Sequence, residues 1–138
     1  MSQPVLQLRM FDKEKDHALL AEWCDAHGES VTPAPLLPPL GVIVQADGED
    51  AAALFVYYAL SAGVAFIDGA ATRPKTSLKD MIAYFDFAIG FLRQEAQRDG
   101  YAVLVAQVRP SVARCLSRMG FYTQEEGMVR MFMPTADE

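Results

Sequence analysis

A short basic segment offers the clearest site for chemistry in this sequence. Arg73, Lys75 and Lys79 supply three cations within seven residues, and the hydroxyls of Thr76 and Ser77 lie between them. A helical pattern of apolar residues follows directly. Because the first amides of a helix are unpaired and its dipole is positive there, this position favours phosphate or another anion. The alternative is a solvated first turn in which Ser77 caps the helix.

Asp68 is the best candidate for a general base. It is the single charged residue of the otherwise uncharged run 51–72. Enclosure among apolar side chains would make its carboxylate a stronger proton acceptor, as base catalysis requires. The alternative is a charge at the end or edge of a strand, paired with a backbone amide or an arginine.

The remaining reactive side chains form no convincing site. Cys24 and His27 are three residues apart on one expected helix, but no second pair accompanies them, so we predict no metal. Cys115 has no histidine close in sequence and is expected to be a small core residue. Two cysteines make no disulfide framework, and the sequence opens with no apolar signal segment, which together favour a cytoplasmic location.

The elements that must position these residues alternate between strand and helix patterns. Strand patterns occupy 5–10, 41–46, 53–60, 64–71, 101–108 and 128–133. Helical patterns lie between Asp12 and Gly28, between Ser77 and Gly100, and over 110–119. The prolines of 29–40 predict an ordered extended loop without a helix, residues 47–50 predict a hairpin turn, and an extended segment follows Gly120.

The predicted order is therefore β-α-loop-β-β-β-α-β-α-β-β. Three strands joined by hairpins, followed by strand–helix–strand, imply a mixed sheet with one right-handed parallel crossover. We expect residues 1–138 to form a single α/β (α+β) domain, because this length suits one core and no linker or repeat interrupts it.

The long helix is apolar on most of its circumference. Besides its main apolar stripe, Tyr84, Phe87 and Phe91 form a second line. A partner must cover this line, and we expect either a long loop or another chain. In the second case, a homodimer or a complex with a protein partner would form through these three residues.

Charge and composition exclude several classes of protein. The net charge of −6 argues against a general nucleic-acid binder, although residues 73–118 carry eight basic and four acidic residues. The run 51–67 lacks charge over 17 residues, yet its Ser61-Ala62-Gly63 turn signal favours two buried strands over a membrane span. The basic segment within an acidic chain is the pattern that an anionic ligand favours.

The order of elements and three motifs resemble the GNAT superfamily of N-acetyltransferases. The motifs are Thr72-Arg73-Pro74, Gly100-Tyr101, and the stretch from Val112 to Gly120-Phe121. Trp23, the proline-rich loop and Leu40-Gly41-Val42 are also similar to small GNAT-like proteins of bacteriophages. The resemblance implies an acyl-CoA-dependent transfer of an acetyl group to a small-molecule or protein amine.

The resemblance also implies where acetyl-CoA would bind. In that family the cofactor lies where the fourth and fifth strands separate, with its pyrophosphate at the start of the next helix. The corresponding residues here are Ala71, Thr72, Arg73, Lys75, Thr76, Ser77, Leu78 and Lys79. The sequence departs from the family pattern in two ways: residues 72–80 contain no glycine, and Leu116 stands where a tyrosine acid is usual. The alternative function is a GNAT-like binding protein without catalysis, for example a phage protein that modulates a host enzyme.

Overall fold

The computed structural model describes residues 3–129, 131 and 133–136. Its elements, in chain order, are β1 Leu6–Met10, α1 Lys13–Ala26, the 3₁₀ turn η1 Ala34–Leu36, β2 Leu40–Ala46, β3 Glu49–Tyr58, β4 Val64–Thr72, α2 Leu78–Arg98, β5 Val103–Ala106 and α3 Pro110–Ser117. The predicted elements through the short third helix are therefore present.

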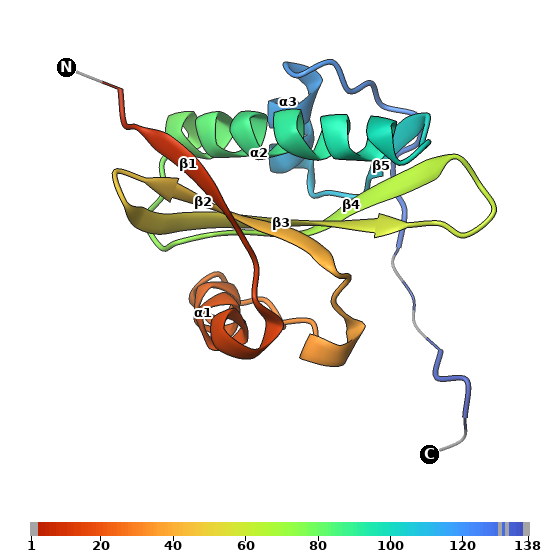
Figure 1. The fold of residues 1–138 in the computed structure, drawn as a ribbon, viewed down its shortest axis with the longest axis horizontal. Coiled ribbons are helices and arrows are strands. Elements are labelled where there is room, and N and C mark those ends of the chain that lie inside the picture. Colours follow the sequence, from red (N-terminus) through yellow and green to blue (C-terminus); the bar gives the residue numbers. More distant parts are fainter. Residues whose placement is uncertain (1–2, 130, 132, 137–138) are drawn as a thin grey trace.

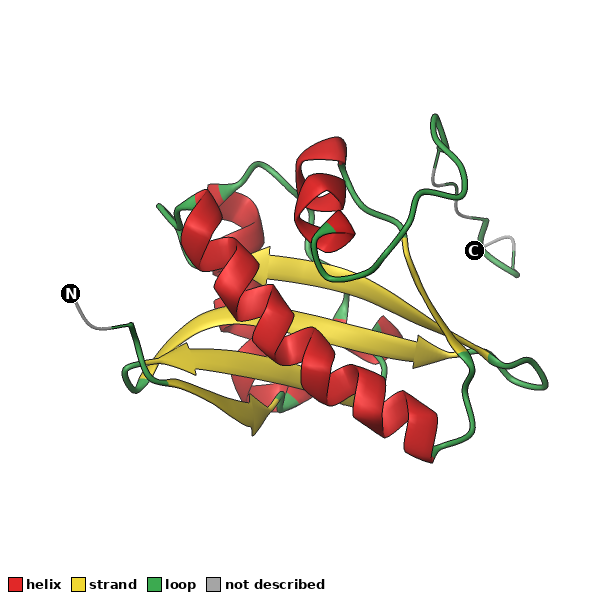
Figure 2. Cartoon of the chain, turned by 90° about the horizontal axis from the view of Figure 1, so that it is seen from above, coloured by secondary structure: helices red, strands yellow, loops and turns green. Residues whose placement is uncertain are grey.

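The strands form one five-stranded sheet in the order β1-β2-β3-β4-β5. The first three pairings are antiparallel and the β4–β5 pairing is parallel, with α2 as the crossover between them. Figure 1 shows α2 and α3 on one face of this sheet and α1 on the other. Seen from above, α2 runs diagonally across the strands, with α3 beside it (Figure 2). The predicted α/β class with a mixed sheet is confirmed.

Alternation along the strands divides the buried side chains between two cores. On β2, Val42 and Val44 pack under α2, whereas Ile43 packs with Trp23 of α1. Such alternation follows from the two-residue period of a strand, which sends neighbouring side chains to opposite faces. The larger core lies under α2 and α3, and the smaller core lies under α1.

Local signals in the sequence fix the ends of the elements. The carboxylate of Asp12 accepts hydrogen bonds from the first amides of α1, and Ser77 Oγ accepts one from the amide of Asp80 in α2. Asp47 and Gly48 both have positive φ, 50° and 84°, which matches the tight turn between two antiparallel strands. The predicted caps are confirmed, and β3 begins before the predicted residue 53 because the turn needs only two residues.

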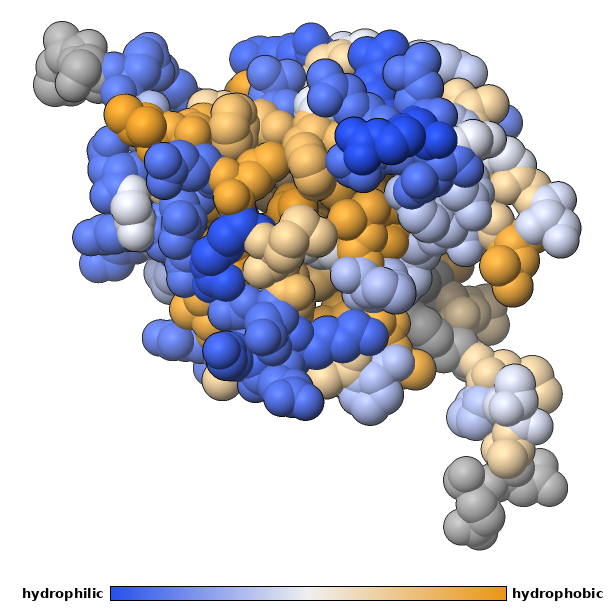
Figure 3. Space-filling model, viewed as in Figure 1, coloured by the Kyte–Doolittle hydropathy of each residue, from blue (hydrophilic) through white to orange (hydrophobic). Residues whose placement is uncertain are grey.

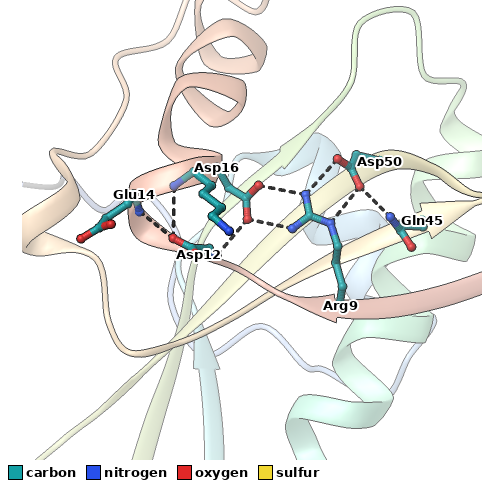
Figure 4. Close-up of polar contacts among 7 residues, drawn as sticks. Arg9, Asp12, Glu14, Asp16, Gln45 and Asp50 are labelled. Carbon is teal, nitrogen blue, oxygen red and sulfur yellow. Dashed lines mark hydrogen bonds and ion pairs between the residues drawn. The ribbon is translucent and has the colours of Figure 1, made fainter.

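A partly buried charge network joins β1, α1 and β3 (Figure 4). Arg9 donates two hydrogen bonds to the carboxylate of Asp16, at 2.8 and 2.9 Å, and two to Asp50, at 3.1 and 2.9 Å. Asp16 also accepts from the amide of Asp12, and Asp50 accepts from Gln45. These hydrogen bonds, chiefly those from Arg9, hold the pKa of Asp16 and that of Asp50 below the ordinary value.

Two predictions about irregular segments are wrong. The proline-rich stretch contains the 3₁₀ turn at Ala34–Leu36, because proline is accepted in the first turn of such a helix. The closing strand at 128–133 is absent from the described residues of that segment, where Met128, Val129, Met131 and Met133 are exposed and pair with no strand. Residues 130 and 132 of the predicted strand lie outside the described residues. Without a neighbouring strand, an alternating pattern has nothing to stabilise the extended form.

The structure divides the second apolar line of α2. Tyr84 is buried in the larger core, with 2% of its surface exposed, whereas Phe87 is 39% exposed. Phe91 is partly buried against the same core. The expectation that Tyr84 contributes to a surface for a second chain is therefore wrong, because the helix turns it toward the sheet.

Apolar residues also reach the surface of the molecule. On the face seen in Figure 1, apolar residues gather across the middle of the molecule, with hydrophilic residues above and below them (Figure 3). No helix within the described residues has the length and apolar character needed to cross a bilayer.

Candidate functional site

The parallel strands β4 and β5 stay together for only four residues. Val64 pairs with Val103 and Ile67 pairs with Ala106, where β5 ends. Since β4 continues to Thr72, its last residues have an edge that no described strand covers. An uncovered edge presents backbone amides and carbonyls that a ligand can reach.

A cleft of about 230 Å³ lies beside this edge, and we call it the β4–α3 cleft. Its lining residues come from four elements: Ala70, Ala71 and Thr72 of β4, Met81 and Phe85 of α2, Val112 of α3 with the preceding Arg109, and His27 and Glu29 after α1. The cleft therefore has an apolar wall and a rim of polar and charged side chains. That combination is typical of sites for small molecules and cofactors.

A β-bulge shapes β4 where the two strands separate. Ala53 pairs with Ala71, but Phe55, two residues later on β3, pairs with Asp68, three residues earlier on β4. The extra residue is accommodated at Gly69, whose φ of +68° favours glycine. A Cβ there would lie 2.9 Å from Cδ2 of Phe55, so close packing also requires glycine at this position.

Asp68, the predicted base, lies at this bulge. Its Oδ1 accepts a hydrogen bond of 2.8 Å from the amide of Gly69. The side chain is half-buried, so the expected enclosure among apolar groups is only partial. The bulge bends the chain here, and Asp68 comes one residue after Ile67, the last residue of β4 that pairs with β5. Asp68 is not among the residues that line the β4–α3 cleft, and it pairs across β3 with Phe55, which packs in the smaller core.

The basic segment divides between two surroundings. Arg73 turns beneath α2, where it binds Glu49 at 3.2 Å and the hydroxyl of Tyr84 at 3.3 Å. Lys75 and Lys79 are exposed at the start of α2. Of the three predicted cations, Lys75 and Lys79 therefore keep exposed side chains, whereas Arg73 is bound to Glu49 and Tyr84.

Lys75 adopts a backbone conformation that glycine usually takes. Its φ is +64°, in the left-handed region that glycine adopts most readily. The hydroxyl of Thr76 donates to the carbonyl of Arg73 across the same turn, and Ser77 Oγ accepts from the amide of Asp80. The loop thus makes a tight left-handed turn without glycine.

Three residues of the cleft rim carry no signal for this role in the sequence. Glu29 and Arg109 belong to no motif, and His27 lacks the second pair of ligands that a metal site needs. They come from two loops that are 80 residues apart in the chain, and no local pattern links them. Among the residues that the structure describes, no group of His, Cys, Asp and Glu could hold a metal ion.

Helix α3 carries no tyrosine, and its one thiol, Cys115, is buried. Leu116 and Cys115 are both buried in the core. Burial raises the pKa of the Cys115 thiol and likewise that of Cys24, which disfavours the nucleophilic thiolate.

The tyrosines near β5 are occupied at the opposite end of the strand. Tyr58 stacks on Tyr101 with ring centres 4.2 Å apart, and its hydroxyl donates to Asp99 at 3.0 Å. Burial, followed by the hydrogen bond to Asp99, raises the pKa of Tyr58 to about 12. Tyr122 is 86% exposed. Neither Tyr58 nor Tyr122 belongs to the lining of the β4–α3 cleft.

Comparison with known proteins identifies the fold. No protein-family model matches the chain, and no curated protein matches its sequence. Among solved structures, an acetyltransferase from Trypanosoma brucei is 17% identical with a TM-score of 0.62, over 93% of this chain and 100% of that one. This chain has the GNAT fold.

Two further GNAT-fold neighbours are informative. An aminoglycoside acetyltransferase from an uncultured soil metagenomic sample, in complex with sisomicin, is 13% identical with a TM-score of 0.65, over 95% of this chain and 97% of that one. N-acetylglutamate synthase from Neisseria gonorrhoeae, complexed with coenzyme A and N-acetyl-glutamate, is 13% identical with a TM-score of 0.62, over 85% of this chain and 28% of that one. At these identities the likeness concerns the fold.

Proposed function

We propose that this protein is an N-acetyltransferase that binds acyl-CoA in the β4–α3 cleft and transfers the acyl group to an amine. One observation carries the proposal: the open edge of β4 borders an apolar cleft and leads directly to the start of the 21-residue helix α2. A long ligand with an amide-containing arm and a phosphate end fits this sequence of surfaces. The GNAT fold of the neighbours supports the same assignment.

The residues present fit such a ligand in three places. The uncovered edge of β4 can pair with amide groups, as an added strand would. Met81, Phe85 and Val112 form the apolar wall beside it. Lys75 and Lys79 add positive charge where the helix start already favours phosphate.

The chain itself would contribute positioning and proton transfer. When bound, acyl-CoA supplies an activated thioester carbonyl for attack by the amine. Asp68 is the carboxylate assigned to accept the proton of the amine, and the amide of Gly69 holds its Oδ1 in place. Because Leu116 replaces the usual tyrosine on α3, we assign the proton for the leaving group to water.

Calorimetry with CoA and acetyl-CoA tests the binding site. The Lys75→Gly/Lys79→Ala variant removes both exposed charges and keeps the left-handed turn, and we expect at least tenfold weaker binding, about 1.4 kcal/mol. A Lys13→Ala/Lys15→Ala variant loses two charges from α1, on the other face of the sheet, and should bind like the native protein. No binding by the native protein at millimolar CoA would overturn the proposal.

Transfer to a panel of primary amines tests the assigned base. Asp68→Asn should lower the rate of transfer about 10²- to 10⁴-fold, the usual contribution of a general base. Its affinity for CoA should stay close to that of the native protein. An unchanged rate in Asp68→Asn would remove this residue from the mechanism.

A further inference from the structure

The turn after α1 holds the open edge of β4 by a side chain. His27 Nε2 lies 3.1 Å from the carbonyl oxygen of Thr72 and donates a hydrogen bond to it. The amide of Arg73 donates to Ala51 on β3. Because the carbonyl and the amide of one peptide group point in opposite directions, the Thr72 carbonyl faces away from β3, into the cleft. His27 therefore occupies an edge carbonyl that a bound arm would use.

A second contact crosses the same cleft two residues later. Glu29 Oε2 lies 3.6 Å from Nη2 of Arg109, the residue that precedes α3. His27 and Glu29 follow α1, which covers the other face of the sheet from α3. Together the two contacts join α1 to β4 and to the start of α3 across the cleft.

The cleft is smaller than most sites for small molecules. It measures about 230 Å³, whereas sites for small molecules usually measure about 300–1,000 Å³. The apolar wall formed by α2 and α3 is part of the core, so the rim is the part that can move. His27 and Glu29 are both exposed, and Gly28 between them has φ of +71° with no atom near its Cβ position.

We propose that residues 27–29 form a latch across the β4–α3 cleft, which an entering ligand must displace. The inference rests on the proposed function, since acyl-CoA is the ligand considered. Entry of the ligand breaks the hydrogen bond from His27 to Thr72 and separates Glu29 from Arg109. The Thr72 carbonyl can then accept a hydrogen bond from the ligand. The contacts that cross the cleft are weak, because they consist of an exposed ion pair and partly buried hydrogen bonds between His27 and Thr72. The backbone amides of residues 27–29 stay bonded to the last residues of α1.

Stopped-flow and calorimetric binding of CoA to four proteins tests the latch. The native protein is compared with Glu29→Gln, with His27→Ala/Glu29→Gln, and with Glu95→Gln as the control. Glu95→Gln breaks an ion pair with Arg98 on α2, away from the cleft lining, by the same chemical change. We expect Glu29→Gln to bind CoA about two- to fivefold faster and tighter, as an exposed ion pair permits. The double variant should exceed it, and the control should match the native protein.

Hydrogen exchange provides a readout that needs no ligand. Amides of residues 27–31 should exchange faster in the double variant than in Glu95→Gln, because the released turn is held by fewer contacts. Equal CoA binding by all four proteins would overturn the latch and leave the proposed function standing. Binding by none of them would overturn the proposed function and the latch with it.

Discussion

The hydroxyl of Tyr84 lies 3.3 Å from Nη2 of Arg73, which donates a hydrogen bond to it. This contact joins the loop after β4 to the buried side of α2, and it draws the Arg73 guanidinium toward the core. Arg73 therefore holds the loop that carries Lys75, and its guanidinium is bound to Glu49 and Tyr84. Arg73 was expected to bind an anion and instead holds the loop, and Tyr84 was expected at an interface and instead lies in the core.

Substitutions on α2 should separate core from surface. Tyr84→Ala should lower the free energy of unfolding by about 3–5 kcal/mol, since it empties a large buried site. Phe87→Asp should lower it by less than about 1.5 kcal/mol, because the side chain is partly exposed. Urea denaturation followed by circular dichroism measures both. An unfolded Phe87→Asp variant would place Phe87 in the core instead.

The bulge at Gly69 should tolerate no side chain. Gly69→Ala forces a left-handed alanine and a contact with Phe55, and we expect a loss of about 2–4 kcal/mol. Gly90→Ala is the matched control, since Gly90 is exposed in the interior of α2 with open space around it. It should gain about 0.5–1 kcal/mol from the better helix former. A native-like stability for Gly69→Ala in the same urea titration would contradict the bulge.

The left-handed conformation of Lys75 makes its own prediction. Lys75→Gly should raise the free energy of unfolding by up to about 1 kcal/mol, because glycine adopts this conformation without strain. Lys75→Ala should stay close to the native value, since both residues carry a Cβ atom. Lys75→Val should be less stable than either, because branching at Cβ makes positive φ harder to reach. Thermal unfolding ranks the three variants, and a Val variant equal to Gly would argue for an ordinary turn.

The network around Arg9 should make stability depend on acid. In the folded protein, hydrogen bonds from Arg9 lower the pKa of Asp16 and of Asp50, so the unfolded chain binds more protons in this range. The stabilisation is complete above the unfolded-state pKa of about 4 and is lost as the pH falls through the lower folded values.

Urea midpoints at pH 7, 5, 4 and 3 measure this dependence. The native protein should be equally stable at pH 7 and 5 with respect to this network, and progressively less stable below about pH 4. Asp16→Asn should lose about 1–3 kcal/mol at pH 7, because the bidentate contact with Arg9 becomes weaker. It should also show a shallower decline in acid. A decline as steep as that of the native protein would assign the acid sensitivity to other carboxylates.

Much of the architecture could be predicted from short-range patterns. The caps at Asp12 and Ser77, the turn at Asp47-Gly48 and the periodicity of α2 each depend on residues within a few positions of one another. Such signals depend on neighbouring residues and not on distant parts of the chain, so they can be recognised in the sequence. The mixed sheet followed from the order of those elements.

Predictions failed where distant partners decide. The alternating segment 128–133 has the pattern of a strand, but a strand needs a neighbour, and its described residues have none. Tyr84 and Phe87 both lie on an apolar line, yet only the placement of α2 against the sheet determines that Tyr84 is buried. Lys75 shows the converse, since its left-handed conformation has no signature in residue type.

By itself, the sequence determined most of the elements as far as α3, their order and the basic start of α2, because hydrophobic period, capping and turn chemistry act locally. Only the tertiary structure decided the rim of the cleft, where His27 and Glu29 of one turn meet Thr72 of β4 and Arg109 before α3. Those contacts join residues 45 and 80 positions apart. Their geometry depends on how the sheet stacks against both helical layers, which no local pattern encodes.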